Sequence, residues 1–222
     1  MKRVVVIIAG SVIEDMEFLR QRIEAAAPEA VLCADGGARY AHALGLAPDL
    51  IIGDMDSLED ELLRHFEEKG VAVAPYPIRK DETDTQLALI QALAMNPEEI
   101  LIFGAMGRRL DHTLANLGLL MMGLEKGVPV RLLDEDCEVF VITGAATLNG
   151  KKGQTVSIFP WVGEGPWRYP ERLRISPGRC DHDPGQAPRD QQPVDGGGGA
   201  DQGRYWLFTH NPLLGYTIRS IF

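Results

Sequence analysis

The strongest constraint in this sequence is a repeated order of short apolar runs and segments with helical spacing. Residues 4–9 form a continuous, mostly β-branched run, and apolar residues recur at helical spacing over residues 14–27. Strands that are apolar throughout are buried on both of their faces. Their alternation with helices predicts an α/β fold built on a doubly wound, mostly parallel sheet.

This pattern continues along the first 138 residues. We expect strands at residues 4–9, 30–34, 50–52, 71–74, 100–103 and 130–133. We expect helices at residues 14–27, 38–44, 59–69, 83–95 and 111–125. The sequence therefore predicts an α/β domain over residues 1–138, whose ligands would bind beyond the carboxyl ends of the strands.

The remaining residues, 139–222, have a different pattern of residue types. Short β-rich pieces at 139–143, 147–148 and 154–159 are separated by glycine-containing turns, which is typical of a small all-β domain. Between residues 181 and 203 the only hydrophobic residues are Ala187, Val194 and Ala200. Such a composition cannot bury a core, so we expect residues 179–222 to be atypical and at least partly disordered.

Charge and cysteine content exclude several classes of protein. The chain has 22 Lys and Arg against 32 Asp and Glu, a net charge of -10, so a binder of nucleic-acid backbones is not expected. Its apolar runs are far shorter than the ~20 residues that span a membrane, and Glu14 and Asp15 interrupt any signal-peptide core. Cys33, Cys137 and Cys180 show no paired spacing. We expect a cytoplasmic protein without a nucleic-acid or membrane partner.

Polar clusters follow the predicted strands, at residues 35–37, 53–57, 80–84 and 104–112. Because the carboxyl ends of neighbouring parallel strands meet at one edge, Asp54, Asp56, Asp81 and Asp84 are expected to converge. Aspartates in such positions also cap helices and stabilise turns, so each cluster alone has a purely structural explanation. Taken together, several carboxylates at one edge favour a bound cation, and hard oxygen ligands suit Mg²⁺.

The same edge carries positive side chains that suit phosphate, namely Lys80, Arg108 and Arg109. A turn from Gly104 to Gly107 precedes a predicted helix whose N-terminus would favour an anion, although a plain strand-to-helix loop explains it equally well. His112 and Asn116 share one face of that helix, and His112 is either a surface residue or a nucleotide contact. Carboxylates, magnesium and cations together indicate phosphoryl transfer from a nucleotide.

These motifs, in this order and spacing, resemble the thiamine pyrophosphokinase family. The motifs are Ala34-Asp35-Gly36-Gly37, Gly53-Asp54-Met55-Asp56-Ser57, Lys80-Asp81-x-Thr83-Asp84, and Gly107-Arg108-Arg109-x-Asp111-His112 with Asn116. The resemblance implies a nucleotide-binding catalytic α/β domain followed by a thiamine-binding β-sandwich, in a homodimer with active sites between the subunits. The implied reaction moves the pyrophosphoryl group of ATP to the thiamine hydroxyl, giving thiamine diphosphate and AMP.

The resemblance also implies roles for individual residues. The family's magnesium ligands correspond to Asp54, Asp56 and Asp84, and Asp81 or Asp84 is the candidate acceptor of the hydroxyl proton. Nucleotide and phosphate contacts correspond to Lys80, Gly107, Arg108, Arg109, Asp111, His112 and Asn116, with Asp35 at the edge of the site.

The sequence departs from the family after Gly178, where the expected Ser-Asn segment that holds thiamine is missing. One hypothesis is a slip of the reading frame near Gly178, since the codons of residues 181–183 read one base later permit a β-branched strand. Two other functions stay open at this point: a non-catalytic protein that binds metal and nucleotide, and a metal-dependent phosphohydrolase. AMP release that depends on thiamine would separate the three.

Overall fold

The computed structural model describes residues 3–77, 81–143, 146–150, 156–161, 173–177, 204–210 and 219–220. Its central feature is a sheet whose parallel strands lie in the order β4-β3-β2-β1-β5-β6. These strands are β1 (Val4–Ile8), β2 (Ala30–Ala34), β3 (Leu50–Gly53), β4 (Ala72–Pro75), β5 (Glu99–Phe103) and β6 (Val130–Leu133). The α/β fold with a mostly parallel sheet is thereby confirmed.

The helices connect these strands, as the apolar spacing predicts. They are α1 (Met16–Ala26), α2 (Ala38–Ala43), α3 (Asp60–Glu68), α4 (Asp84–Ala94) and α5 (Leu110–Lys126). Asp15 caps α1 by accepting from the Phe18 N–H, and Thr83 caps α4 by accepting from the Gln86 N–H. Across the described part of the chain, each helix is too short or too polar to cross a membrane.

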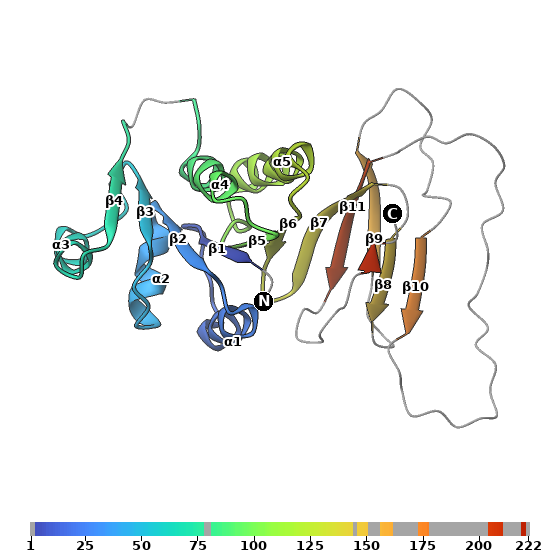
Figure 1. Cartoon of the computed structure of the whole chain (residues 1–222), viewed down its shortest axis with the longest axis horizontal. Coiled ribbons are helices and arrows are strands. Elements are labelled where there is room, and N and C mark those ends of the chain that lie inside the picture. The colour runs from blue at the N-terminus through green and yellow to red at the C-terminus, as the bar shows by residue number, and fades with distance from the viewer. Residues whose placement is uncertain are drawn as a thin grey trace.

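Helices cover both faces of the parallel sheet, so its central strand has no face exposed to solvent (Figure 1). Val5 and Ile7 of β1 belong to the core layer that contains apolar residues of α4 and α5. Val4, Val6 and Ile8 belong to the other layer, with apolar residues of α1, α2 and α3. Burial on alternate sides explains why β1 is apolar at every position rather than at every second one.

Beyond β6 the sheet continues with antiparallel strands. β7 (Cys137–Thr143) pairs with β6, β11 (Arg204–His210) pairs with β7, and β9 (Val156–Trp161) pairs with β11. A second sheet has the order β10-β8-β12, formed by Leu173–Pro177, Ala146–Gly150 and Arg219–Ser220. The expected boundary between residues 138 and 139 lies inside β7, and the division into two domains stays a prediction. Within residues 179–222, which we expect to be atypical and partly disordered, residues 204–210 and 219–220 form β11 and β12, and the other residues of this range lie outside the described residues.

The junction between the parallel and antiparallel strands contains a buried ion-pair network. Glu138 of β7 is 1% exposed, and its carboxylate accepts a hydrogen bond from Nη1 of Arg131 on the neighbouring strand β6. Nε of Arg131 lies 2.9 Å from Oε1 of Glu99, and Nη2 of Arg22 lies 3.7 Å from Oε2 of Glu138. The network therefore links α1, β5, β6 and β7 around one buried carboxylate.

We predict that Glu138→Gln lowers the free energy of unfolding by about 1.5–3 kcal/mol, because it leaves the partly buried Arg131 and Arg22 guanidinium groups with less compensation. Urea denaturation followed by circular dichroism measures this change. Glu17→Gln is the matched control, since the Glu17 side chain is 65% exposed and lies 3.7 Å from Arg20. Glu17→Gln should change the free energy of unfolding by no more than about 0.5 kcal/mol. Equal midpoints for the two variants would contradict a stabilising role for the network.

Candidate active site

A cleft of about 460 Å³ opens where the strand order reverses, between β1 and β5. Strand β1 pairs with β2 on one side and with β5 on the other side. The loops that leave β1 and β5 therefore diverge and make room for a ligand. The cleft is lined by residues that directly follow β1, β2, β3 and β5, including Ala9, Gly10, Asp35, Asp54 and Gly104. The position of the cleft agrees with the prediction that ligands bind at the carboxyl ends of the strands.

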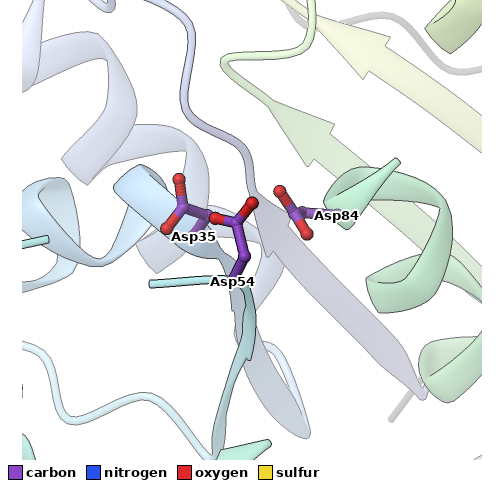
Figure 2. Close-up of side chains that lie close together, drawn as sticks. All are labelled: Asp35, Asp54 and Asp84. Carbon is purple, nitrogen blue, oxygen red and sulfur yellow. The ribbon is translucent and has the colours of Figure 1, made fainter. Parts of the chain in front are cut away.

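Three carboxylates come together in this cleft, from Asp35, Asp54 and Asp84 (Figure 2). One oxygen from each lies within 4.8 Å of the others. Asp35 directly follows β2, Asp54 directly follows β3, and Asp84 is the first residue of α4. The parallel register that pairs Ala34 with Ile52 brings the first two strand ends to the same level.

Gly53, the last residue of β3, makes this approach of carboxylates possible. Its φ is +153°, and a Cβ built there would lie 2.8 Å from Cβ of Asp35 and 3.2 Å from Cγ of Asp84. Any side chain at this position would therefore push two of the three acidic groups away. The glycine is part of the site because it keeps the space between them open.

Asp35 shows two features that fit a bound cation. Its φ is +42°, a backbone conformation that costs about 1–3 kcal/mol for a non-glycine residue and that clusters at functional sites. The residue is 9% exposed, and its Oδ1 has no hydrogen-bond partner among the residues that the structure describes. A buried carboxylate oxygen without a donor, beside two further carboxylates, suits a hard divalent cation as its partner.

The three carboxylates that lie together in the cleft are not the same set that the sequence predicts. Asp56 is exposed and lies outside the group; its Oδ1 accepts a hydrogen bond from the Ser57 hydroxyl at 3.1 Å. Asp35, expected at the edge of the site, lies within the group instead. Asp81 is exposed and does not line the described wall of the cleft, and Lys80 lies outside the described residues.

Positive and polar side chains from the loop after β5 and from α5 line the same cleft. Arg108, Arg109 and His112 contribute to its wall, as does Asn116. The amide of Asn116 is buried and donates to the carbonyl of Ala105 at 2.7 Å, so it also fixes the loop that precedes α5. The cleft thus combines a negative group and a positive group, which suits a metal-bound phosphate ligand.

Arg109 makes a bidentate ion pair with Asp111 at the mouth of the cleft. Nε of Arg109 donates to Oδ1 at 3.2 Å, and Nη2 donates to Oδ2 at 2.5 Å. Both side chains are about two-thirds exposed, at 67% and 64%. The hydrogen bond from Arg109 lowers the pKa of Asp111 to about 2. Asp111 therefore holds the Arg109 guanidinium and does not itself line the described cleft.

Sequence reasoning missed the contribution of the loop after β1. Ser11 and Val12 line the cleft together with Gly10, and Glu82, Thr83 and Thr85 line it near α4. The loop after β1 carries no charged residue between Gly10 and Ile13, so it gave no chemical signal. The position of β1 beside the reversal of strand order is the signal that could have identified it.

Comparison with known proteins finds similarity to one family of enzymes over most of the residues that line this cleft. A family profile described as "Thiamin pyrophosphokinase, catalytic domain" matches residues 23–132, which include all three clustered aspartates and both arginines. The chain is 40% identical over 91 residues to thiamine pyrophosphokinase of Bacillus subtilis (strain 168), covering 41% of this chain and 42% of that protein. It is 29% identical over 133 residues to thiamine pyrophosphokinase 1 of Oryza sativa subsp. japonica, covering 50% and 49%.

The fold agrees with a solved structure over a longer range. The crystal structure of thiamine pyrophosphokinase from Bacillus subtilis superposes with a TM-score of 0.63 at 20% identity, covering 97% of each chain. In sequence, the matched stretch spans less than half the length of each of the two curated relatives.

We predict that the low pKa of Asp111 depends on Arg109, and carboxyl NMR titration measures it. In the unmodified chain the Asp111 carboxyl should titrate near pH 2, so the ion pair is complete at neutral pH and is lost only as the pH falls through that value. Arg109→Ala should return the pKa of Asp111 toward 3.8, its ordinary value. Arg108→Ala is the control and should leave it low; the same titration curve in all three proteins would show that the pair does not form.

Proposed function

Because this chain belongs to the thiamine pyrophosphokinase family, we propose that it transfers the pyrophosphoryl group of ATP to the hydroxyl of thiamine, giving thiamine diphosphate and AMP. The observation that carries this proposal is the cleft at the reversal of strand order, where three carboxylates and two arginines face one space inside the matched residues. That combination of charges suits a metal-bound polyphosphate.

We propose that Asp35, Asp54 and Asp84 hold Mg²⁺, and that Asp56 acts beside them. Support comes from the proximity of the three carboxylates and from the unpartnered Oδ1 of Asp35. Magnesium held there would neutralise the carboxylates and draw negative charge from the phosphate oxygens of ATP.

The positive side chains hold and orient the triphosphate in this proposal. Arg108, Arg109 and His112 line the cleft and can donate to phosphate oxygens, and the resemblance to the family implies the same role for Lys80. When the nucleotide binds, Arg109 exchanges its carboxylate partner Asp111 for a phosphate oxygen. This exchange costs little free energy because the Arg109–Asp111 ion pair is exposed. Gly107 and Asn116 support the same loop, since the Gly107 N–H donates to the Thr113 hydroxyl at 3.3 Å.

The transfer itself forms one bond and breaks one. The thiamine hydroxyl oxygen bonds to the β-phosphorus of ATP, the bond from that phosphorus to the oxygen bridging to the α-phosphate breaks, and AMP leaves with the bridging oxygen. A carboxylate accepts the hydroxyl proton, with Asp81 and Asp84 as the candidates. Of these two, Asp84 lines the cleft. The arginines stabilise the negative charge that develops on the departing phosphate.

We also propose that the chain works as a homodimer and that residues 139–222 supply thiamine contacts. Both proposals come from the resemblance to the family. The apolar side chains of Leu110 and Leu114, one turn apart on α5, are 67% and 58% exposed, and Val12 at the cleft is 59% exposed. Exposed apolar side chains beside a cleft suit a surface that a second subunit covers.

Thiamine-dependent release of AMP separates this function from its two alternatives. The transferase releases AMP from ATP only when thiamine is present. A metal-dependent phosphohydrolase would release phosphate products without thiamine, and a non-catalytic binder would bind ATP and release nothing. The carboxylates and arginines of the cleft alone suit all three, whereas the family membership favours the transferase.

We predict that Asp35→Asn and Asp84→Asn each lower thiamine-dependent AMP release at least about a hundredfold, because each removes a negative ligand of the metal. Both variants should keep the circular dichroism spectrum and thermal midpoint of the unmodified chain within a few degrees. Calorimetric titration with Mg²⁺ and α,β-methylene ATP should show weaker metal binding in both.

Two further substitutions test which aspartates belong to the metal site. Asp56→Asn should have a smaller effect than Asp35→Asn if the carboxylate group of the cleft sets metal affinity. Asp60→Asn, at the exposed start of α3, is the control and should leave activity unchanged. A full loss in Asp56→Asn with normal activity in Asp35→Asn would overturn the proposed ligand set.

A further inference from the structure

The loop after β1, residues 10–13, lines the cleft and is held there by hydrogen bonds to its main chain. The N–H of Ser11 donates to the carbonyl of Gly104 at 2.9 Å, and the carbonyl of Ser11 accepts from the Tyr40 hydroxyl at 2.9 Å. Both main-chain groups of Ser11 are therefore engaged with other segments. Its position relative to the cleft is set by the fold.

Tyr40 of α2 joins the loop at several points. The residue is 9% exposed, and its hydroxyl accepts from the Ile13 N–H at 3.0 Å and from Nη2 of Arg39 at 3.2 Å. The same Nη2 of Arg39 donates to the carbonyl of Gly10 at 2.7 Å. One phenol and one guanidinium thus fix Gly10, Ser11 and Ile13, which is the whole length of the loop apart from Val12.

The chain that follows the loop is fixed as well. Oε1 of Glu135, between β6 and β7, accepts from the Glu14 N–H at 2.8 Å and from the Asp15 N–H at 3.0 Å. Burial raises the pKa of Glu135, but hydrogen bonds from Asp134 and from these two amides outweigh it and lower the pKa. Glu135 therefore stays ionised at neutral pH and anchors the end of the loop.

The side chain of Ser11 packs directly against the turn that carries the arginines. A Cβ built at Gly107 would lie 3.1 Å from Cβ of Ser11 and 3.3 Å from its Oγ. A side chain at Gly107 would crowd Ser11, and Arg108 and Arg109 follow Gly107 in the chain. The Ser11 hydroxyl makes no hydrogen bond with any residue in the part of the chain that the structure describes.

We propose that Ser11 is a substrate-binding residue whose hydroxyl donates a hydrogen bond to a phosphate oxygen of the nucleotide, and that Tyr40 is the residue that positions it. This inference rests on the proposed function, because that function supplies the nucleotide. A half-buried hydroxyl in the cleft wall, beside two arginines that favour an anion, meets a phosphate oxygen as its natural acceptor. The ordered loop holds the hydroxyl in place before the nucleotide arrives, so little freedom is lost on binding.

The test measures binding of α,β-methylene ATP with Mg²⁺ by calorimetry, since this analogue cannot undergo the transfer. Ser11→Ala should weaken binding about tenfold or more, because a hydrogen bond to a charged group is lost. Ser11→Thr, which keeps a hydroxyl, should restore at least part of this affinity. Gln21→Ala, which removes an exposed polar side chain of α1 outside the described cleft wall, is the control and should bind as the unmodified chain does.

Tyr40→Phe tests the positioning role, because it keeps the buried ring and removes only the hydroxyl. It should raise the KM for ATP about threefold to tenfold while the KM for thiamine stays unchanged, a split that simple loss of stability would not produce. Nucleotide affinity in Ser11→Ala equal to that of the unmodified chain would overturn the role of Ser11. Failure of the unmodified chain to release AMP with thiamine would instead overturn the proposed function, and the binding comparison would still decide the role of Ser11.

Discussion

Mutual repulsion among three carboxylates is the constraint on which the site depends. With one oxygen from each of Asp35, Asp54 and Asp84 within 4.8 Å of the others, each ionised pair repels by about 3 kcal/mol at an effective dielectric of about 20. The carboxylates can lie this close together because Gly53 has no side chain between them and because Asp35 adopts a positive φ. A divalent cation would turn this repulsion into attraction, and it would give the buried Oδ1 of Asp35 the partner that the described residues do not supply.

The reversal of strand order between β1 and β5 places the rest of the machinery around those carboxylates. The loop after β5 carries the arginines, and the loop after β1 carries Ser11. The two loops are joined by the hydrogen bond from the Ser11 N–H to the Gly104 carbonyl and by the packing of Ser11 on Gly107. The site is therefore one connected surface rather than a set of separate motifs, and the arginine-bearing turn and the first strand are positioned together.

Much of this arrangement followed from the sequence, because apolar runs and helical spacing fix the order of strands and helices locally. The convergence of Asp54 and Asp84 followed from the rule that parallel strands meet at their carboxyl ends. The exchange of Asp56 for Asp35 in the acidic group could not be predicted, since it depends on a positive φ and on the direction of one turn. Ser11 escaped notice because its importance lies in the contacts of its main chain, which leave no pattern of residue types. Strands β10 and β12 were also missed.

Crystals of the chain soaked with Mn²⁺ and α,β-methylene ATP would show whether the three carboxylates bind a metal, because Mn²⁺ gives an anomalous signal and accepts the same oxygen ligands as Mg²⁺. We predict an anomalous peak about 2.1 Å from carboxylate oxygens of Asp35, Asp54 and Asp84, with Asp35 Oδ1 among them. A peak held by Asp56 with no contact to Asp35, or nucleotide bound in the cleft with no metal at the three carboxylates, would contradict it.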